Sequence, residues 1–178
     1  MYDGCNTRRA TRTEDIVAMS ETNFSQLEIA VLIPCYNEAV AIGAVVRDFR
    51  AALPAARIYV YDNNSKDGTA KVAAEAGAIV RHEPWQGKGN VVRRMFSDIE
   101  ADIYVLVDGD DTYDATAAPA LVQKLLSESL DMVNGARLET SQQAYRMGHR
   151  FGNVMLTSLV AWFFGARFND MLSGYRIM

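Results

Sequence analysis

The chain has 178 residues, of which 49% are hydrophobic and 22% are charged, a balance typical of one globular domain with a sizeable core. Its net charge of −4 and its pI near 5.2 exclude the basic surplus on which general nucleic-acid binding depends. The two cysteines cannot form a disulfide framework. Because Cys35 lies in an apolar run, we expect a buried, reduced thiol and a reducing cytoplasm.

The first 26 residues are polar and charged, and they contain no apolar stretch of the kind that signal peptides carry. We expect residues 1–26 to be a mobile polar leader. Residues 27–178 are expected to form a single domain.

Strand and helix patterns alternate from Leu27 onward. Short apolar or β-branched runs predict the strands Leu27–Ile33, Arg57–Tyr61, Ala78–Arg81, Ile103–Val107 and Asp131–Gly135. Apolar residues three and four apart predict the helices Glu38–Leu53, Thr69–Ala76, Asn90–Glu100 and Thr116–Ser129. This alternation is typical of βαβ units, so we expect an α/β fold with a mostly parallel, doubly wound sheet and helices on both faces.

Several local signals refine these elements. Pro34 is expected to stop the first strand, and Asn37 to cap the helix that follows. The core side of that helix is predicted to hold Val40, Ala44, Val45, Phe49 and Leu53. The core side of the last predicted helix is expected to hold Ala118, Leu121, Val122, Leu125 and Leu126.

Ligands of such sheets sit at the carboxyl ends of the strands. This rule brings four loops to one rim: residues 34–38, residues 62–68, the turn that begins at Asp108, and the loop after Gly135. Polar residues that are scattered along the chain are therefore expected to form one site.

Asp108-Gly109-Asp110-Asp111 follows a buried strand and places three carboxylates within four residues. These groups repel one another unless a cation lies between them, and Gly109 lets the backbone bend so that two of them share one side. Carboxylate oxygens suit Mg²⁺ or Mn²⁺, especially an ion that carries a diphosphate. The alternative is a solvated acidic turn that leads into the next helix.

The other rim loops carry groups that suit a nucleotide. Main-chain groups beside Tyr36 and Glu38 can bind a nucleotide base. The alternative is that Glu38 only stabilises the next helix through its dipole. Asp62 can accept from a base N–H, or it can belong to a plain polar turn. Lys88 lies between two glycines and can approach a phosphate, although such a loop can also be merely flexible.

Five motifs in order give the chain a resemblance to the family 2 glycosyltransferases with the GT-A fold, and to their dolichyl-phosphate mannose synthase branch. The motifs are Pro34-Cys35-Tyr36-Asn37-Glu38, Asp62-Asn63-Asn64-Ser65-Lys66-Asp67-Gly68-Thr69, Gly87-Lys88-Gly89, Asp108-Gly109-Asp110 and Asp170-Met171-Leu172-Ser173-Gly174-Tyr175-Arg176. The resemblance implies that residues 27–178 are one GT-A catalytic domain.

The resemblance also implies roles for individual residues. Metal ligands are expected at Asp108 and Asp110, holding Mg²⁺ or Mn²⁺. The donor nucleotide sugar, a UDP- or GDP-hexose, is expected to contact Pro34, Tyr36, Glu38, Asp62, Asn64, Lys88, Asp108 and Gly109. The branch usually continues its acidic motif as D-A-D-L, whereas this chain continues with Asp111-Thr112-Tyr113, which leaves the third metal ligand and the substrate open.

Convergent positive charge suits a phosphate acceptor. Arg137 follows the fifth predicted strand. Arg146 and Arg150 are four residues apart, so on a helix they would share one face. The alternative is that these arginines only form a solvated surface. We expect Arg137, Arg150 and Asp170 to be the catalytic residues. Asp170 either acts as a base or orients the acceptor.

The stretch from Gly148 to Gly165 has an apolar core, Val154–Phe164, that would form about 16 Å of helix. Since a bilayer core is about 30 Å thick, this helix cannot cross it. It suits a membrane surface, or else a buried core or a contact between copies in a homo-oligomer. Similar enzymes carry later membrane helices, so we expect a truncated chain or a separate membrane partner.

These expectations combine into one hypothesis. The chain would be a metal-dependent, inverting glycosyltransferase that moves a hexose to a polyprenyl phosphate at the inner face of the membrane. A phosphate monoester is already mostly a dianion near neutral pH, so such an acceptor needs charge compensation and no strong base. Three alternatives remain. The first is a family 2 transferase with a sugar or lipid hydroxyl acceptor, which would need a base. The second is a nucleotidyltransferase, although Pro34-Cys35-Tyr36-Asn37-Glu38 stands where such enzymes normally carry a Gly-rich loop. The third is a non-catalytic nucleotide-sugar binding module.

Overall fold

The computed structural model describes residues 27–135 and 173–178. Its strands are β1 (Ile29–Cys35), β2 (Arg57–Asp62), β3 (Ile79–His82), β4 (Ile103–Leu106), β5 (Val133–Gly135) and β6 (Tyr175–Ile177). Its helices are α2 (Ile42–Ala52), α3 (Thr69–Glu75), α4 (Lys88–Asp98) and α5 (Ala118–Ser127), with a 3₁₀ turn η1 (Ala115–Ala117) before α5. The predicted leader and the predicted helix at 148–165 lie outside the described residues.

The strands form one sheet in the order β3-β2-β1-β4-β6-β5. The pairs β1–β2, β2–β3 and β1–β4 are parallel, whereas β6 runs antiparallel to both β4 and β5. The predicted α/β class is confirmed, with a mixed sheet. Strand β6 was not predicted, because three residues are too few to show an alternating pattern.

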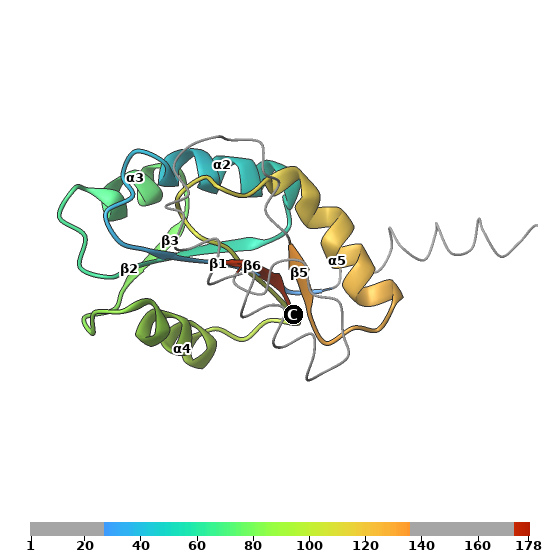
Figure 1. The fold of residues 1–178 in the computed structure, drawn as a ribbon. Coiled ribbons are helices and arrows are strands. Elements are labelled where there is room, and N and C mark those ends of the chain that lie inside the picture. The colour runs from blue at the N-terminus through green and yellow to red at the C-terminus, as the bar shows by residue number, and fades with distance from the viewer. Residues whose placement is uncertain (1–26, 136–172) are drawn as a thin grey trace, which may run out of the picture.

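Helices cover both faces of the sheet, as predicted: α2, α3 and α5 lie on one face and α4 on the other (Figure 1). Alternate residues of β1 supply the two cores. Val31 and Ile33 pack with α2 and α5, and Ala30 and Leu32 pack with α4. Because both faces are covered, every residue of β1 is buried.

Several local predictions near the ends of elements were wrong. β1 continues through Pro34 to Cys35. Helix α2 begins only at Ile42 and has no side-chain cap, so Asn37 does not cap it and Val40 is exposed. Helix α4 begins at Lys88, two residues earlier than predicted. Leu126 of α5 is partly exposed, while Val122 and Leu125 are buried as expected.

The register of the parallel strands brings their carboxyl ends level. Cys35 lies beside Asp62, and Asp62 lies beside His82. Leu106 pairs with Leu32, so the acidic turn leaves the sheet next to the loop after β1. The loops that carry the sequence motifs therefore meet at one edge.

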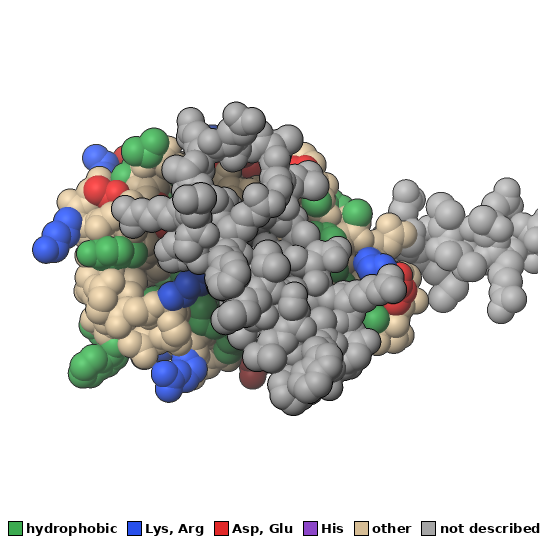
Figure 2. Space-filling view, in the orientation of Figure 1, with side chains coloured by type: hydrophobic (Ala, Val, Ile, Leu, Met, Phe, Trp, Pro, Cys, Tyr) green, Lys and Arg blue, Asp and Glu red, His purple; other side chains and the backbone are tan. Residues whose placement is uncertain are grey.

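The described surface mixes its charges. Figure 2 shows basic, acidic and hydrophobic side chains interspersed over the coloured part of one face.

Within the ranges 27–135 and 173–178, no helix is long and apolar enough to span a bilayer.

Candidate active site at the carboxyl ends of the strands

A cavity of about 300 Å³ opens at the carboxyl ends of β1 and β4. It brings together six of the residues predicted from the sequence: Pro34, Tyr36, Glu38, Lys88, Asp108 and Asp110. Cys35, Asn63, Gln86, Gly87 and Val91 also line it. Carboxylates, an ammonium and an exposed tyrosine ring thus share one hollow, as the rim rule predicts.

The acidic turn presents its first two carboxylates differently. Asp108 is partly buried, and its Oδ1 atom forms an ion pair with the Lys88 ammonium. Asp110 is exposed, and its Oδ1 atom accepts a hydrogen bond from the Thr112 N–H at 3.1 Å. Asp111 adopts the left-handed region, with φ of 61°, which turns the chain away toward η1.

Two glycines let other segments touch this turn. A Cβ atom at Gly109 would lie 2.2 Å from Glu38 Oε2 and 2.6 Å from Cys35 Sγ. A Cβ atom at Gly174, just before β6, would lie 2.2 Å from Asp108 Oδ2. Real Cβ atoms essentially never come this close to another group, so a side chain at either position would force the facing group to move. Gly109 was predicted as a donor contact, and its packing here is against protein.

Glu38 is the most perturbed carboxyl group of the cavity. Its Oε2 atom is buried and has no hydrogen-bond partner within the described residues. The pKa of Glu38 is raised to about 7, chiefly by burial. A hydrogen bond from the Cys35 thiol lowers this pKa in part, whereas the nearby Asp110 and Asp108 carboxylates raise it. Burial and Glu38 in turn raise the pKa of the Cys35 thiol well above its usual range, which keeps that thiol protonated.

The loop after β1 is held by the polar turn after β2. The N–H groups of Asn37, Glu38 and Ala39 donate to Ser65 Oγ at 2.9 Å, Thr69 Oγ1 at 2.8 Å and Asp67 Oδ2 at 3.0 Å. Asn37 Oδ1 accepts from the Lys66 N–H at 2.8 Å. The side chains of the polar turn therefore hold the backbone of residues 37–39, and Asn37 Oδ1 is engaged there rather than at the start of α2.

Asp62 and Asn64 lie next to the cavity without lining it. Asp62 is buried; its Oδ2 atom accepts from the Ser65 N–H at 3.2 Å, and its Oδ1 atom has no partner within the described residues. A buried acceptor without a donor is costly, which suits a ligand that brings an N–H. Asn64 has φ of 68° and donates from Nδ2 to the Pro84 carbonyl at 3.0 Å, so its contacts in this structure are to the loop after β3.

Two residues of the site were missed by sequence reasoning. Asn63 is buried, lines the cavity and binds the loop after β3. Tyr113 accepts a hydrogen bond from the Gly174 N–H at 2.6 Å through its hydroxyl oxygen. Asn63 stands in a run of polar residues, so the sequence does not single it out. Tyr113 was noted in the sequence only because it departs from the family motif. No local pattern distinguishes either residue, because their contacts are with distant segments.

The carboxylates fit a divalent cation that arrives with its diphosphate. Within the described part of the chain, no group of three potential ligands is assembled to hold a metal by itself. Mg²⁺ is usually bound through one or two carboxylates together with substrate phosphates and water. Asp108 and Asp110 can supply those carboxylates, and the Lys88 ammonium already shows that Asp108 attracts a cation.

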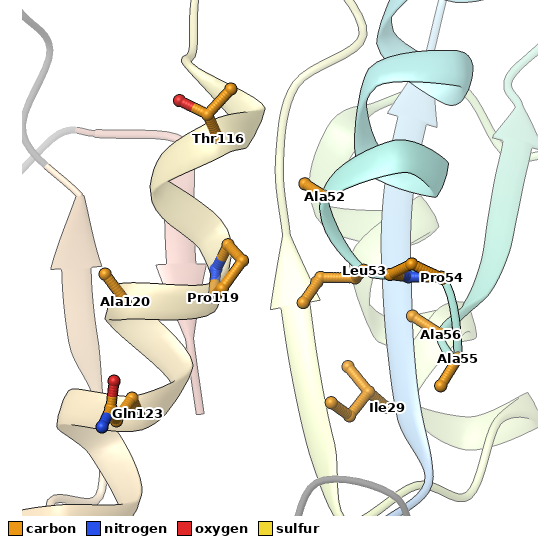
Figure 3. Close-up of a pocket in the computed structure, with 10 residues that line it drawn as sticks. All are labelled: Ile29, Ala52, Leu53, Pro54, Ala55, Ala56, Thr116, Pro119, Ala120 and Gln123. Atoms are coloured by element: carbon orange, nitrogen blue, oxygen red, sulfur yellow. The ribbon is translucent and has the colours of Figure 1, made fainter. Parts of the chain in front are cut away.

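A second, larger hollow of about 550 Å³ lies between the end of α2 and α5. In Figure 3 Ile29 and Leu53 face Pro119 and Ala120 across it. Ile29 begins β1, so this hollow is at the opposite end of that strand from the acidic turn. Its described lining contains no ionisable side chain, so it offers no charge that would attract a diphosphate or a metal.

The predicted acceptor residues Arg137, Arg150 and Asp170 lie outside the described residues, as does Arg146. Their roles stay predictions. The last motif enters the described structure only at Ser173, whose Oγ atom donates to the Gly135 carbonyl.

The comparison with protein families decides the family. The model described as "Glycosyl transferase family 2" matches residues 30–174. The chain belongs to glycosyl transferase family 2. The match begins in β1 and ends at Gly174, so the rim loops described above fall inside the family domain.

Curated relatives of this family 2 chain differ in length. It is 58% identical over 128 residues to Protein RfbJ of Shigella flexneri, covering 71% of this chain and 99% of the relative. It is 38% identical over 150 residues to glycosyltransferase AglJ of Haloferax volcanii, covering 83% of this chain and 49% of the relative. The dolichyl-phosphate hexose transferase of the same organism is 30% identical over 158 residues, covering 89% of this chain and 68% of the relative.

Solved structures show the same fold. Glucosyl-3-phosphoglycerate synthase of Mycobacterium tuberculosis superposes with a TM-score of 0.70 at 24% identity, covering 90% of this chain and 60% of that chain. A complex of that enzyme with Mn²⁺, UDP-glucose and phosphoglyceric acid gives a TM-score of 0.70 at 23% identity, covering 96% and 61%. The family 2 chain thus has the GT-A fold, and it spans about half of AglJ and three fifths of these solved chains.

Proposed function

We propose that this family 2 chain is the catalytic domain of a metal-dependent, inverting glycosyltransferase that moves a hexose from a nucleotide-diphosphate sugar to a polyprenyl phosphate. The observation that carries the proposal is the meeting of Asp108, Asp110 and Lys88 at one cavity on the carboxyl edge of the sheet. That combination suits a diphosphate and its cation, because carboxylates hold the metal and an ammonium meets the phosphate oxygens.

The donor is a UDP- or GDP-hexose. Pro34 and the exposed ring of Tyr36 offer an apolar wall for its base, and the partnerless Oδ1 atom of Asp62 offers an acceptor for a base N–H. Asn64 shapes the loop beside it. The solved complex of a structural relative with Mn²⁺ and UDP-glucose supports this class of donor.

The leaving group is a nucleoside diphosphate whose negative charge grows as the glycosidic bond breaks. Bound at Asp108 and Asp110, Mg²⁺ or Mn²⁺ supplies Lewis-acid compensation for that charge. Lys88 adds a donor group that does not depend on the metal. Glu38 and Gly109 keep the acidic turn close to the loop that follows β1, so the base and the diphosphate contacts are held at a fixed spacing.

The acceptor is the phosphate of a polyprenyl lipid. As a dianion it is a sufficient nucleophile, and it needs only positioning and positive charge, which Arg137 and Arg150 would provide and Asp170 would orient. The similarity to a dolichyl-phosphate hexose transferase supports this acceptor. A lipid acceptor also places the reaction at a membrane surface, to which the apolar stretch 154–164 is suited.

The experiment is a transfer assay on the full chain. Radiolabelled UDP- and GDP-hexoses are offered with Mn²⁺ to undecaprenyl phosphate in detergent, to a panel of sugar and lipid hydroxyl acceptors, and to phosphoglyceric acid. We expect label in the lipid phosphate, loss of transfer with a chelator, and loss of at least about 100-fold in Asp108→Asn and Asp110→Asn.

Transfer to a hydroxyl acceptor alone would replace the lipid-phosphate proposal with the hydroxyl alternative. In that case Asp170→Asn should abolish the reaction, because a hydroxyl needs a base. Binding of metal and nucleotide without turnover on any acceptor would instead favour a binding module.

A further inference from the structure

The buried side chain of Asn63 binds the loop that leads into α4. Its Nδ2 atom donates to the carbonyl oxygens of Glu83 at 2.7 Å and Trp85 at 2.9 Å. Its Oδ1 atom accepts from the Gly87 N–H at 2.7 Å. The amide therefore has both of its protons and its oxygen engaged by one short segment.

Gly87 is the N-cap residue of α4, directly before its first helical residue. It has φ of 127°, and its carbonyl accepts from the Asn90 N–H at 2.9 Å, in the first turn of the helix. Lys88 is the first helical residue, and its ammonium reaches Asp108. A direct chain of contacts thus runs from Asn63 through Gly87 to Lys88 and the acidic turn.

The rest of the segment reinforces this arrangement. The Glu83 N–H donates to the Asp62 carbonyl at 3.0 Å, and the buried Glu83 carboxylate accepts from the Trp85 N–H at 2.7 Å. Lys88 itself is exposed and carries a flexible side chain, so its position depends on where its backbone is held. Asn63 is the only residue of the described chain whose side chain binds Glu83, Trp85 and Gly87 together.

We propose that Asn63 is a positioning residue of the donor site: it sets where α4 begins and so places Lys88 for the donor diphosphate. The proposal deepens the proposed function and rests on it for the identity of the ligand. It assigns Asn63 a route of action, through Lys88, that a merely structural role would not require.

The route is tested by a double-mutant cycle on the full chain. The dissociation constants of Mn²⁺–UDP and Mn²⁺–GDP are measured by calorimetry for wild type, Asn63→Ala, Lys88→Ala and the double variant. We expect each single change to weaken binding of the preferred nucleotide by about ten-fold, and the double variant to be little weaker than Lys88→Ala, because the two residues act as a unit. Losses that multiply to about 100-fold would overturn the proposal.

A second measurement needs no nucleotide. Amide hydrogen exchange of residues 85–91 should become faster in Asn63→Ala than in wild type, while exchange in β1 should not change. Unchanged exchange of residues 85–91 would also overturn the proposal. If wild type binds neither nucleotide, the proposed function fails, and the exchange measurement still decides whether Asn63 fixes the start of α4.

A control and a second variant complete the design. Asn90→Ala removes one hydrogen bond to the same segment, from Nδ2 to the Gln86 carbonyl at 3.1 Å on the exposed side, and should leave nucleotide affinity within about two-fold. Should Asn63→Ala not fold, Asn63→Asp keeps the acceptor for Gly87 and loses both donors. Its loss of affinity should again disappear in the Lys88→Ala background, whereas repulsion of the nucleotide by the new charge would persist there.

Discussion

The Lys88 ammonium pairs with the Asp108 carboxylate, the group expected to hold the metal. More than half of the lysine side chain is exposed, so the pair is screened by solvent and contributes little to the stability of the fold. The ion pair instead makes Lys88 a competitor of the metal, because the Lys88 ammonium and a metal ion would bind the same carboxylate oxygen of Asp108.

Replacing Lys88 by Met should therefore act with opposite signs on two ligands. We expect Mn²⁺ alone to bind about two- to five-fold more tightly, since the competing ion pair is lost. Mn²⁺ together with a nucleoside diphosphate should bind more weakly, since the phosphate loses its ammonium. Calorimetric titration measures both affinities.

Lys124 offers a matched control, because it forms an exposed ion pair with Glu128 on α5, away from the cavity. Lys124→Met should leave both affinities unchanged. If Lys88→Met weakened the binding of Mn²⁺ alone, the competition described above would be wrong.

Gly174→Ala tests the contact between β6 and the acidic turn. The new methyl group would lie 2.2 Å from Asp108 Oδ2, so the carboxylate must move. We expect Mn²⁺–nucleotide affinity and transfer activity to fall at least ten-fold, by an order-of-magnitude estimate for a displaced ligand. Gly89→Ala, where a Cβ atom meets nothing within 4 Å, should keep or raise the melting temperature. Normal activity of Gly174→Ala would show that the position of Asp108 is not critical.

Glu38→Gln should change how stability depends on pH. Burial raises the pKa of Glu38 in the folded state from 4.5 to about 7, so between these values the folded protein holds a proton that the unfolded chain releases. The wild type thus loses stability from this group as pH rises through that window. The glutamine variant does not titrate, so its melting temperature relative to wild type should increase between about pH 5 and pH 8. A difference that stayed constant with pH would contradict the raised pKa.

Tyr113→Phe removes the acceptor of the Gly174 N–H. Leaving that partly buried donor without a partner should lower the free energy of unfolding by about 1–3 kcal/mol. Because Gly174 touches Asp108, we expect weaker binding of Mn²⁺ and nucleotide as well. Chemical denaturation and calorimetry measure the two effects.

Tyr104→Phe is the control for this change. The Tyr104 hydroxyl accepts from the Ala101 N–H at 3.2 Å and donates to the Ile99 carbonyl at 2.8 Å, on the side of the sheet covered by α4. It should destabilise the fold to a similar degree with no effect on nucleotide affinity. Equal affinities for wild type and Tyr113→Phe would limit Tyr113 to a role in stability.

The order of apolar runs and polar motifs along the chain was enough to predict the class of fold and the chemical groups of the site. Runs such as Ile29–Ile33 and Ile103–Val107 are apolar because the sheet is covered on both faces. Such a run can be recognised from a few consecutive residues, without knowledge of the fold. Asp108, Asp110 and Lys88 stand at the ends of such runs, and the rule that parallel strands bind ligands at their carboxyl ends was enough to bring them together.

The neighbours of these residues follow from how the chain folds in three dimensions. Asn63 and Asn64 are adjacent and identical in type, yet Asn63 alone is buried and lines the cavity. Gly174 is distant from Asp108 in sequence and lies against it, because β6 pairs antiparallel with β4. Contacts of this kind depend on strand order and register, which three-residue strands do not encode locally, and so the support of the site became visible only in three dimensions.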